Sequence, residues 1–231
     1  MNKPTGPDFF NKDAAKSYDE KNAKLSKISD CMHFLTGLAL RDLPADARIL
    51  CVGAGTGAEI LPLAQANPGW KFVALEPSLD MLNICRERMA QADVSDRCEF
   101  VHGYVQDYKG PAEFDAALSI LVAHFIKREE RLPFFKEMTA RLKRGGYLVN
   151  AEISFDLDSP EFPMMLEGWK GVQTLMGATP ESLAALPTVL RDVLTVVPPE
   201  QTEAWLRQAG VESPVRFFQA MMIHGTMGKK S

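Results

Sequence analysis

The sequence predicts a doubly wound α/β fold: a mostly parallel, seven-stranded sheet with helices on both faces. Strand-like apolar runs alternate with helix-like segments from residue 48 to residue 153, and such alternation implies right-handed crossovers and a parallel sheet. A glycine-rich turn follows the first run, and Glu76 ends the second. Residues 211–227 have the pattern of two further strands, which predicts an antiparallel pair at the sheet edge.

Five parallel strands are expected in the central part of the chain because short apolar runs there are bounded by turn residues. They are residues 48–52, 71–75, 98–102, 114–119 and 147–153. A helix over 58–66 should end at Asn67-Pro68-Gly69. Ser78 can cap a second helix, in which apolar residues recur at helical spacing: Met81, Leu82, Cys85 and Met89.

The remaining helices are predicted from the same two signals, apolar spacing and caps. One spans 129–142 and should be stopped by Gly145-Gly146, because glycine commonly ends helices. Another spans 28–40, ahead of the sheet, and a further one spans 199–209. Thr179-Pro180 are placed as the N-cap and first residue of a helix. It lies in a stretch rich in Met, Phe and Pro that runs from 154 to 198 and predicts a helical insert.

The turn RILCVGAGTGA, residues 48–58, predicts a site for a nucleotide-like cofactor. Gly53, Gly55 and Gly57 lack a Cβ, so the chain can turn sharply while its backbone N–H groups approach a ligand. Glu76 suits the two hydroxyls of a ribose; its alternative role is a carboxylate at a helix start. The turn also satisfies the dinucleotide pattern GxGxxG/A, with Ala58 last. A nicotinamide enzyme, however, usually repeats the βαβ unit in a second half, and this chain does not.

Length, charge and cysteine content limit the classes of partner and the cellular location that are expected for this chain. With 231 residues, 46% of them hydrophobic, the chain can bury one full core, so a single domain is expected. A net charge of -4 and a pI near 5.6 give no basic field for nucleic acid or an anionic membrane. The four cysteines form no CxxC pair, which favours reduced thiols, no metal site and a cytoplasmic location. The start MNKPTGPDFF lacks the apolar core of a signal peptide, and the apolar stretch 116–126 is too short to span a bilayer.

Several motifs together resemble the class I S-adenosylmethionine-dependent methyltransferases. They are NKDAAKSYDEK, VGAGTG, LEPS, FDAALSI, LKRGGYLV and WLRQAGV, and they cover nearly the whole chain. VGAGTG with Glu76 and LKRGGYLV are the specific parts. The resemblance implies a Rossmann-like methyltransferase sheet that binds S-adenosylmethionine. It divides the single domain into an N-terminal helical cap (1–45), a cofactor-binding core (46–153), a helical lid insert (154–198), and a C-terminal helix with the strand pair (199–231).

The resemblance also assigns cofactor-binding roles to individual residues. Backbone at the turn would contact the methionine moiety, an acid would bind the ribose, two residues would flank the adenine, one would lie beside the amino-acid end, and an aromatic would close over the cofactor. In that order these are Gly53, Ala54 and Gly55; Glu76; Tyr104 and Val105; Ser119; and Tyr18. Tyr18 could equally be a core residue.

Within that superfamily the pattern is most similar to the carboxy-S-adenosylmethionine synthase group, which acts in tRNA wobble-uridine modification. Three positions differ from that group. Pro187 stands where it has an arginine for the extra carboxylate, with Arg191 four residues further on; Cys51 replaces the acid heading the first motif; and Gly103-Tyr104 replaces Gly-Asp. A desolvated carboxylate needs a cationic partner, so we expect plain S-adenosylmethionine or its demethylated product as ligand.

The acceptor side of the site is less defined. His124 follows the fourth strand at the ligand-binding edge of the sheet, so it is the candidate catalytic base; the alternative is a histidine hydrogen-bonded at a helix start. The charged run 127–131 is expected to be a solvated helix face. The Met-rich insert is expected to supply the acceptor pocket, and core packing and a homodimer face are its alternatives.

Together these observations predict a methyltransferase that acts on a small-molecule acceptor, without direct nucleic-acid or membrane partners. Three alternatives stay open: a carboxy-S-adenosylmethionine synthase-like enzyme, a non-catalytic S-adenosylmethionine-binding module, and a nicotinamide oxidoreductase. The flanking segments, rather than the cofactor motifs, decide which acceptor is used.

Overall fold

The computed structural model describes residues 19–231, so the predicted cofactor contact of Tyr18 lies outside the described residues. Its sheet has seven strands in the order β3-β2-β1-β4-β5-β7-β6. The strands are β1 (Arg48–Val52), β2 (Lys71–Glu76), β3 (Cys98–His102), β4 (Phe114–Ile120), β5 (Leu142–Ile153), β6 (Val211–Ala220) and β7 (Ile223–Lys230). Strands β1 to β5 are parallel, whereas β7 runs antiparallel to both β5 and β6. The predicted fold class is confirmed.

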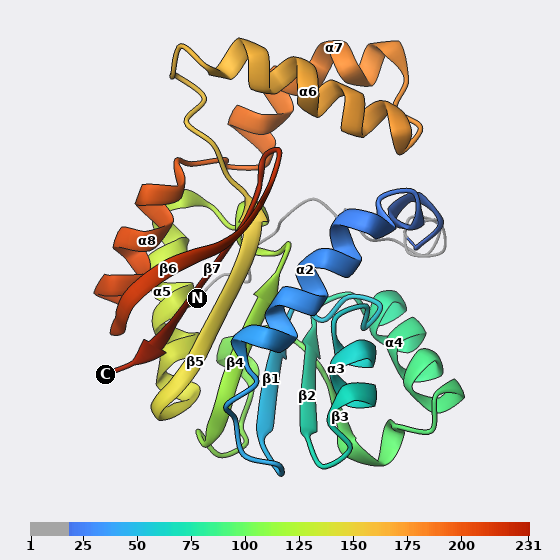
Figure 1. Ribbon diagram of the computed structural model, residues 1–231, viewed down its shortest axis with the longest axis vertical. Helices are drawn as coiled ribbons and strands as arrows, with labels where there is room; N and C mark the ends of the chain where they lie inside the picture. Colours follow the sequence, from blue (N-terminus) through green and yellow to red (C-terminus); the bar gives the residue numbers. More distant parts are fainter. Residues whose placement is uncertain (1–18) are drawn as a thin grey trace.

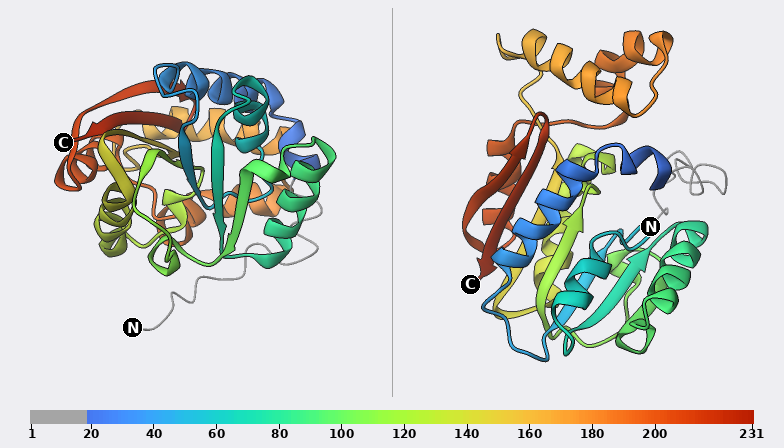
Figure 2. Two further views of the ribbon diagram at one scale, coloured as in Figure 1. Left: turned by 90° about the horizontal axis from the view of Figure 1, so that it is seen from below. Right: turned by 45° about the vertical axis from the view of Figure 1, so that its right-hand side comes forward.

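Helices cover both faces of the sheet (Figure 2). They are α2 (Ser26–Ala39), α3 (Ile60–Ala66), α4 (Leu79–Gln91), α5 (Arg128–Arg141), α6 (Phe162–Leu175), α7 (Pro180–Thr188) and α8 (Pro199–Gln208). Side chains of α3 and α4 share one core cluster with alternate residues of β1, whereas α5 and α8 share another with the residues between them. No helix within residues 19–231 has the length and apolar character needed to cross a membrane.

Local sequence signals account for the start of α4. The Ser78 side chain accepts a hydrogen bond from the Met81 N–H and so caps the helix as predicted. The four apolar residues of that helix are buried. Because α4 follows β2 directly, its capped start stands at the carboxyl edge of the sheet, beside the glycine turn.

The predicted stop of the next helix is wrong. Helix α5 ends at Arg141, and Gly145-Gly146 lie inside β5, which already begins at Leu142. The pairing of β4 with β5 shifts between Phe114 and Ala116, so the strand bulges there. A Cβ on Gly146 would lie 3.1 Å from the carbonyl oxygen of Asp115. Gly146 therefore serves close strand packing, and Gly145 supplies a positive φ of 75°; neither ends the helix.

Residues 154–198 form the predicted helical insert, which stands beyond the carboxyl edge of the sheet (Figure 1). Thr179 caps α7 through its side chain, and the π-helix Val189–Val193 follows. Trp169 and Val172 are buried in a cluster that also holds Met32 of α2 and Met222 of the β6–β7 turn. A Cβ on Gly168 would lie 2.0 Å from Met221 Cε, so α6 lies directly against that turn. The division into four sequence parts stays a prediction.

Candidate active site

The glycine turn joins β1 to α3 at the carboxyl edge of the sheet and folds back onto β2. The N–H groups of Gly53 and Ala54 both donate to the Leu75 carbonyl oxygen, at 2.8 and 2.9 Å. Gly53, Gly55 and Gly57 all have positive φ, at 70°, 53° and 78°, a region that glycine adopts without steric cost. The turn therefore has the backbone conformation that its glycines predict.

Glu76, the last residue of β2, joins the turn to the start of α4. Its Oε2 accepts from the Gly55 N–H at 2.9 Å, and its Oε1 accepts from the Ser78 N–H at 2.8 Å. The side chain is buried, and burial raises its pKa while the two backbone hydrogen bonds oppose that shift. Each carboxylate oxygen can accept more than one hydrogen bond, so Glu76 keeps acceptor capacity for a ligand.

Gly53 has a second reason to be glycine, which the sequence did not reveal. A Cβ there would lie 2.5 Å from Cγ2 of Val122, a residue of the loop that follows β4. Gly55 is less crowded, since a Cβ built there would be in ordinary van der Waals contact with Met81 Cε, at 3.6 Å. Val122 thus packs over the root of the turn, and the backbone around Gly55 stays approachable.

Tyr104 and Val105 lie beside the end of β2, because the Gly103 N–H donates to the Glu76 carbonyl oxygen at 3.1 Å. The Tyr104 N–H donates to Asp107 Oδ2 at 3.1 Å, so the Asp107 carboxylate acts locally in the turn that follows β3. The Val105 side chain is buried in the cluster beneath the sheet edge. Their contact with adenine stays a prediction.

Ser119, near the end of β4, is fully buried and pairs in register with Asn150 of β5. The Ser119 Oγ and the Asn150 Oδ1 have no hydrogen-bond partner among residues 19–231. Orphaned buried polar atoms are rare and commonly mark a site for a bound group or water. A cofactor group could hydrogen-bond to these two atoms, so the predicted role of Ser119 beside the amino-acid end of a cofactor is compatible with the structure. That role stays a prediction.

His124 lies in the 3-10 turn η3 (Ala123–Phe125) that follows β4. Its Nδ1 accepts from the Ile153 N–H at 3.3 Å, and burial, together with the nearby Arg131 cation, lowers its pKa to about 3. The neutral ring that accepts at Nδ1 carries its proton on Nε2. This hydrogen bond goes to the end of β5 rather than to a helix start, and the catalytic role stays a prediction.

The expectation that residues 127–131 form a solvated helix face is wrong for Arg131, whose side chain is 0% exposed. Its Nη1 donates to Glu152 Oε2 at 2.7 Å, its Nε to the Ile126 carbonyl oxygen at 3.2 Å, and its Nη2 to the Thr195 carbonyl oxygen. Thr202 donates to the other Glu152 oxygen at 2.7 Å. Arg131 therefore ties together the loop bearing His124, the end of β5 and the base of the insert.

The residues present fit an adenosyl cofactor. Glu76 offers carboxylate oxygens at the end of β2, and the Gly55 backbone is open to approach. Tyr104 follows β3 next to Glu76. These groups meet at the carboxyl edge of a parallel sheet, where α/β folds bind nucleotides. The structure brings these predicted residues together at one edge of the sheet, and their contacts with a cofactor stay a prediction. The sequence offers no sign of Val122 or of the hydrogen bond to the Ser78 N–H.

Comparisons with known proteins also indicate a methyltransferase domain. Residues 49–146 match the family model described as a methyltransferase domain. An uncharacterized protein of Synechococcus sp. is 33% identical over 110 residues, which cover 46% of this chain and 26% of that protein. Ribosomal RNA small subunit methyltransferase G of Frankia casuarinae is 27% identical over 147 residues, covering 62% of this chain and 54% of that protein. The chain thus spans about a quarter and about half of these two relatives.

The fold has close counterparts among solved structures. The O-methyltransferase family 2 protein of Planctomyces limnophilus, solved in complex with apigenin, superposes with a TM-score of 0.67 at 19% identity. The match covers 96% of this chain and 62% of that one. The resemblance to class I methyltransferases is confirmed, whereas the carboxy-S-adenosylmethionine synthase subgroup is not tested. Residues 49–146 thus match the methyltransferase-domain family model, and they lie in a sheet whose fold is that of solved methyltransferases.

Proposed function

We propose that the chain transfers a methyl group from S-adenosylmethionine to a small-molecule acceptor. The observation that carries the proposal is Glu76, which accepts from the Gly55 N–H of the glycine turn and still has acceptor capacity for a ribose. The methyltransferase-domain match over 49–146 supports the same cofactor. The net charge of -4 argues against a nucleic-acid acceptor, although one relative is named as a ribosomal RNA methyltransferase.

When bound, the sulfonium of S-adenosylmethionine supplies an activated methyl group. The protein then has to hold the acceptor in line with it and exclude water. The turn and Glu76 would orient the donor, and the apolar side chains of α6 would shield the site from water. Because Nδ1 of His124 already accepts from the Ile153 N–H, we propose that His124 positions that strand end rather than removing a proton.

A plain rather than carboxylated ligand is favoured by the position of Arg191. Its Nη1 donates to Asp158 Oδ1 at 2.8 Å, and its Nη2 donates to the Leu157 carbonyl oxygen. The guanidinium that stands nearest in sequence to Pro187 is therefore already paired within the insert. This supports S-adenosylmethionine over carboxy-S-adenosylmethionine, since a buried carboxylate needs a cation.

Mass spectrometry of the ligand that co-purifies with the protein, followed by incubation with methyl-labelled S-adenosylmethionine and a panel of hydroxylated small molecules, tests the proposal. We expect S-adenosylmethionine or S-adenosylhomocysteine in the protein and label in a small molecule. Carboxy-S-adenosylmethionine in the protein, or label in added ribosomal RNA, would contradict it. Tight cofactor binding without any transfer would instead favour a non-catalytic binding module.

The insert also offers a candidate homodimer face. Met164 is 85% exposed and Leu175 is 63% exposed. They are eleven residues apart, about three helical turns, so they lie on the same side of α6. A Cβ on Gly171, between them, would meet nothing within 4 Å. If two copies associate through this side of α6, Met164→Asp should shift the protein toward monomer in sedimentation velocity. The control Phe34→Asp, at an exposed apolar residue of α2, should not. Unchanged sedimentation of Met164→Asp would remove this proposal.

A further inference from the structure

Helix α4 holds the glycine turn through a second contact, beside that of Glu76. Arg88, in the last turn of α4, donates from Nη1 to the Thr56 carbonyl oxygen at 2.8 Å and lies 3.0 Å from the Thr56 Oγ1. Thr56 stands between Gly55 and Gly57 and is 1% exposed. The turn is therefore fixed by a carboxylate that accepts from one of its N–H groups and by a guanidinium that donates to its carbonyl.

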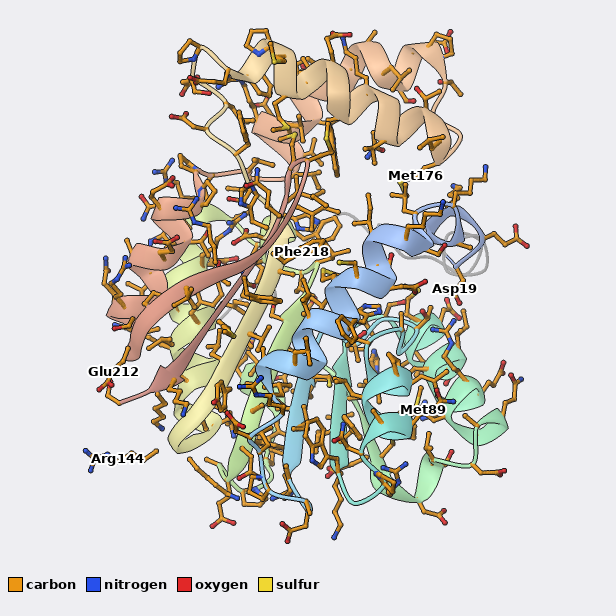
Figure 3. All side chains as sticks on the ribbon, in the orientation of Figure 1. Asp19, Met89, Arg144, Met176, Glu212 and Phe218 are labelled. Carbon is orange, nitrogen blue, oxygen red and sulfur yellow. The ribbon has the colours of Figure 1, made fainter. Side chains whose placement is uncertain are left out.

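The same guanidinium connects the turn to the chain before α2. Arg88 Nη2 forms an ion pair with Asp19 Oδ2, and the Thr56 hydroxyl donates to Asp19 Oδ1 at 2.8 Å. Figure 3 labels Asp19 on the side of the molecule where α4 lies. Both carboxylate oxygens of Asp19 are thus engaged by residues of the glycine turn and α4. We call Asp19, Thr56 and Arg88 the Asp19 clasp.

The clasp differs from a surface ion pair. The side chains of Arg88 and Asp19 are 25% and 38% exposed, whereas those of the Arg41–Asp42 pair are 73% and 72% exposed. Partial burial and the shared Thr56 hydroxyl make the clasp a small network, and charge-assisted hydrogen bonds in such networks are stronger than isolated exposed pairs. Its partners lie 37 and 69 residues apart in sequence. It therefore fixes one segment relative to another instead of stabilising a single helix.

We propose that the Asp19 clasp fastens the segment before α2 to the glycine turn, and that Asp19 and Arg88 are positioning residues for the cofactor. The inference rests on the proposed function. A ligand that needs the Gly55 backbone in its present place gains affinity from every contact that holds Thr56. By linkage, the bound ligand stabilises the contact with Asp19 to the same degree. Neither side chain has to touch the cofactor.

Titration calorimetry with S-adenosylhomocysteine as the probe tests the clasp. Asp19→Asn and Arg88→Met should each weaken binding about fivefold, and the double variant should be no weaker than Arg88→Met alone, because both substitutions remove one shared interaction. Arg86→Met is the matched control, since Arg86 lies on the same helix and its Nη1 donates to the side-chain oxygen of exposed Asn83, at 2.8 Å, within that helix. It should bind like the wild type.

Hydrogen exchange gives a second readout that a purely structural role would not move. In the wild type, S-adenosylhomocysteine should slow exchange in residues 19–23; in Arg88→Met, at saturating ligand, it should not. Equal affinity of all variants, or losses that add in the double variant, would overturn the positioning role while leaving the proposed function intact. A wild type that binds no S-adenosylhomocysteine would overturn both.

Discussion

The two halves of the carboxyl edge of the sheet are held by different kinds of contact. Around β1 and β2, hydrogen bonds to backbone fix the glycine turn: Leu75 accepts two N–H groups, Glu76 accepts another, and Arg88 donates to the Thr56 carbonyl oxygen. Around β5, the insert is held by apolar packing against the β6–β7 turn and by the buried cation of Arg131.

This difference suits the two halves to different ligands, the cofactor and the acceptor. Directional hydrogen bonds at four consecutive residues, Gly53 to Thr56, specify one backbone conformation, which suits a constant cofactor. Apolar packing tolerates rearrangement of Met and Phe side chains, which suits an acceptor pocket that varies between related enzymes. On this account the insert half depends on Arg131 far more than the turn half depends on any one residue.

The largest effect is expected when Arg131 is replaced. Arg131→Met should lower the free energy of unfolding by about 3–5 kcal/mol, because it leaves the buried Glu152 carboxylate without its cation. The measurement is urea denaturation at neutral pH. Arg41→Met, which removes an exposed pair, should change stability by less than about 0.5 kcal/mol.

A double variant sharpens this test. Arg131→Met with Glu152→Met should recover much of the lost stability, since replacing a whole buried pair by apolar side chains is often neutral. If Arg131→Met alone has the same free energy of unfolding as the wild type, the insert half does not depend on this cation, which would contradict the proposed difference between the two halves.

A smaller effect is expected from His124, which lies between the two halves. Its folded pKa of about 3 lies below the 6.5 of the unfolded chain, so below pH 6.5 the unfolded state binds more protons. Its contribution is therefore complete above pH 6.5 and decreases as pH falls toward 3, by about 2 kcal/mol at pH 5. Urea midpoints at pH 7 and pH 5 should differ less in His124→Gln than in the wild type. Equal differences would show that His124 is protonated in the folded protein.

The smallest effect separates backbone strain from side-chain packing in the turn half. Gly53 and Gly145 have φ of 70° and 75°, yet a Cβ at Gly53 meets Val122 and one at Gly145 meets nothing within 4 Å. Gly145→Ala should cost about 1 kcal/mol from conformation alone. Gly53→Ala should cost about 1 kcal/mol more, and adding Val122→Ala should restore that excess. Thermal or urea unfolding of the three variants measures it; equal losses at the two glycines would exclude a role for Val122.

The features that could be predicted from the sequence are those fixed by neighbouring residues, and the features that could not are those fixed by distant ones. The glycine turn, the Ser78 cap and strands β1 and β3 were predictable because each signal lies within a few neighbouring residues. The helix stop predicted at Gly145-Gly146 was wrong because Gly146 is required by a close approach to Asp115 on another strand. Arg131 misled because its partners Glu152 and Thr195 lie 21 and 64 residues away. The Asp19 clasp joins residues 69 apart and has no local signature.

Glu76 is the group proposed to hold the ribose at the glycine turn. Calorimetric titration of S-adenosylhomocysteine into the wild type and Glu76→Ala tests it, with Glu99→Ala on the neighbouring strand β3 as an exposed control. Each lost charge-assisted hydrogen bond costs about 1.5–3 kcal/mol, so Glu76→Ala should bind at least about tenfold more weakly, while Glu99→Ala binds like the wild type. A folded Glu76→Ala protein with wild-type affinity would contradict the proposed site.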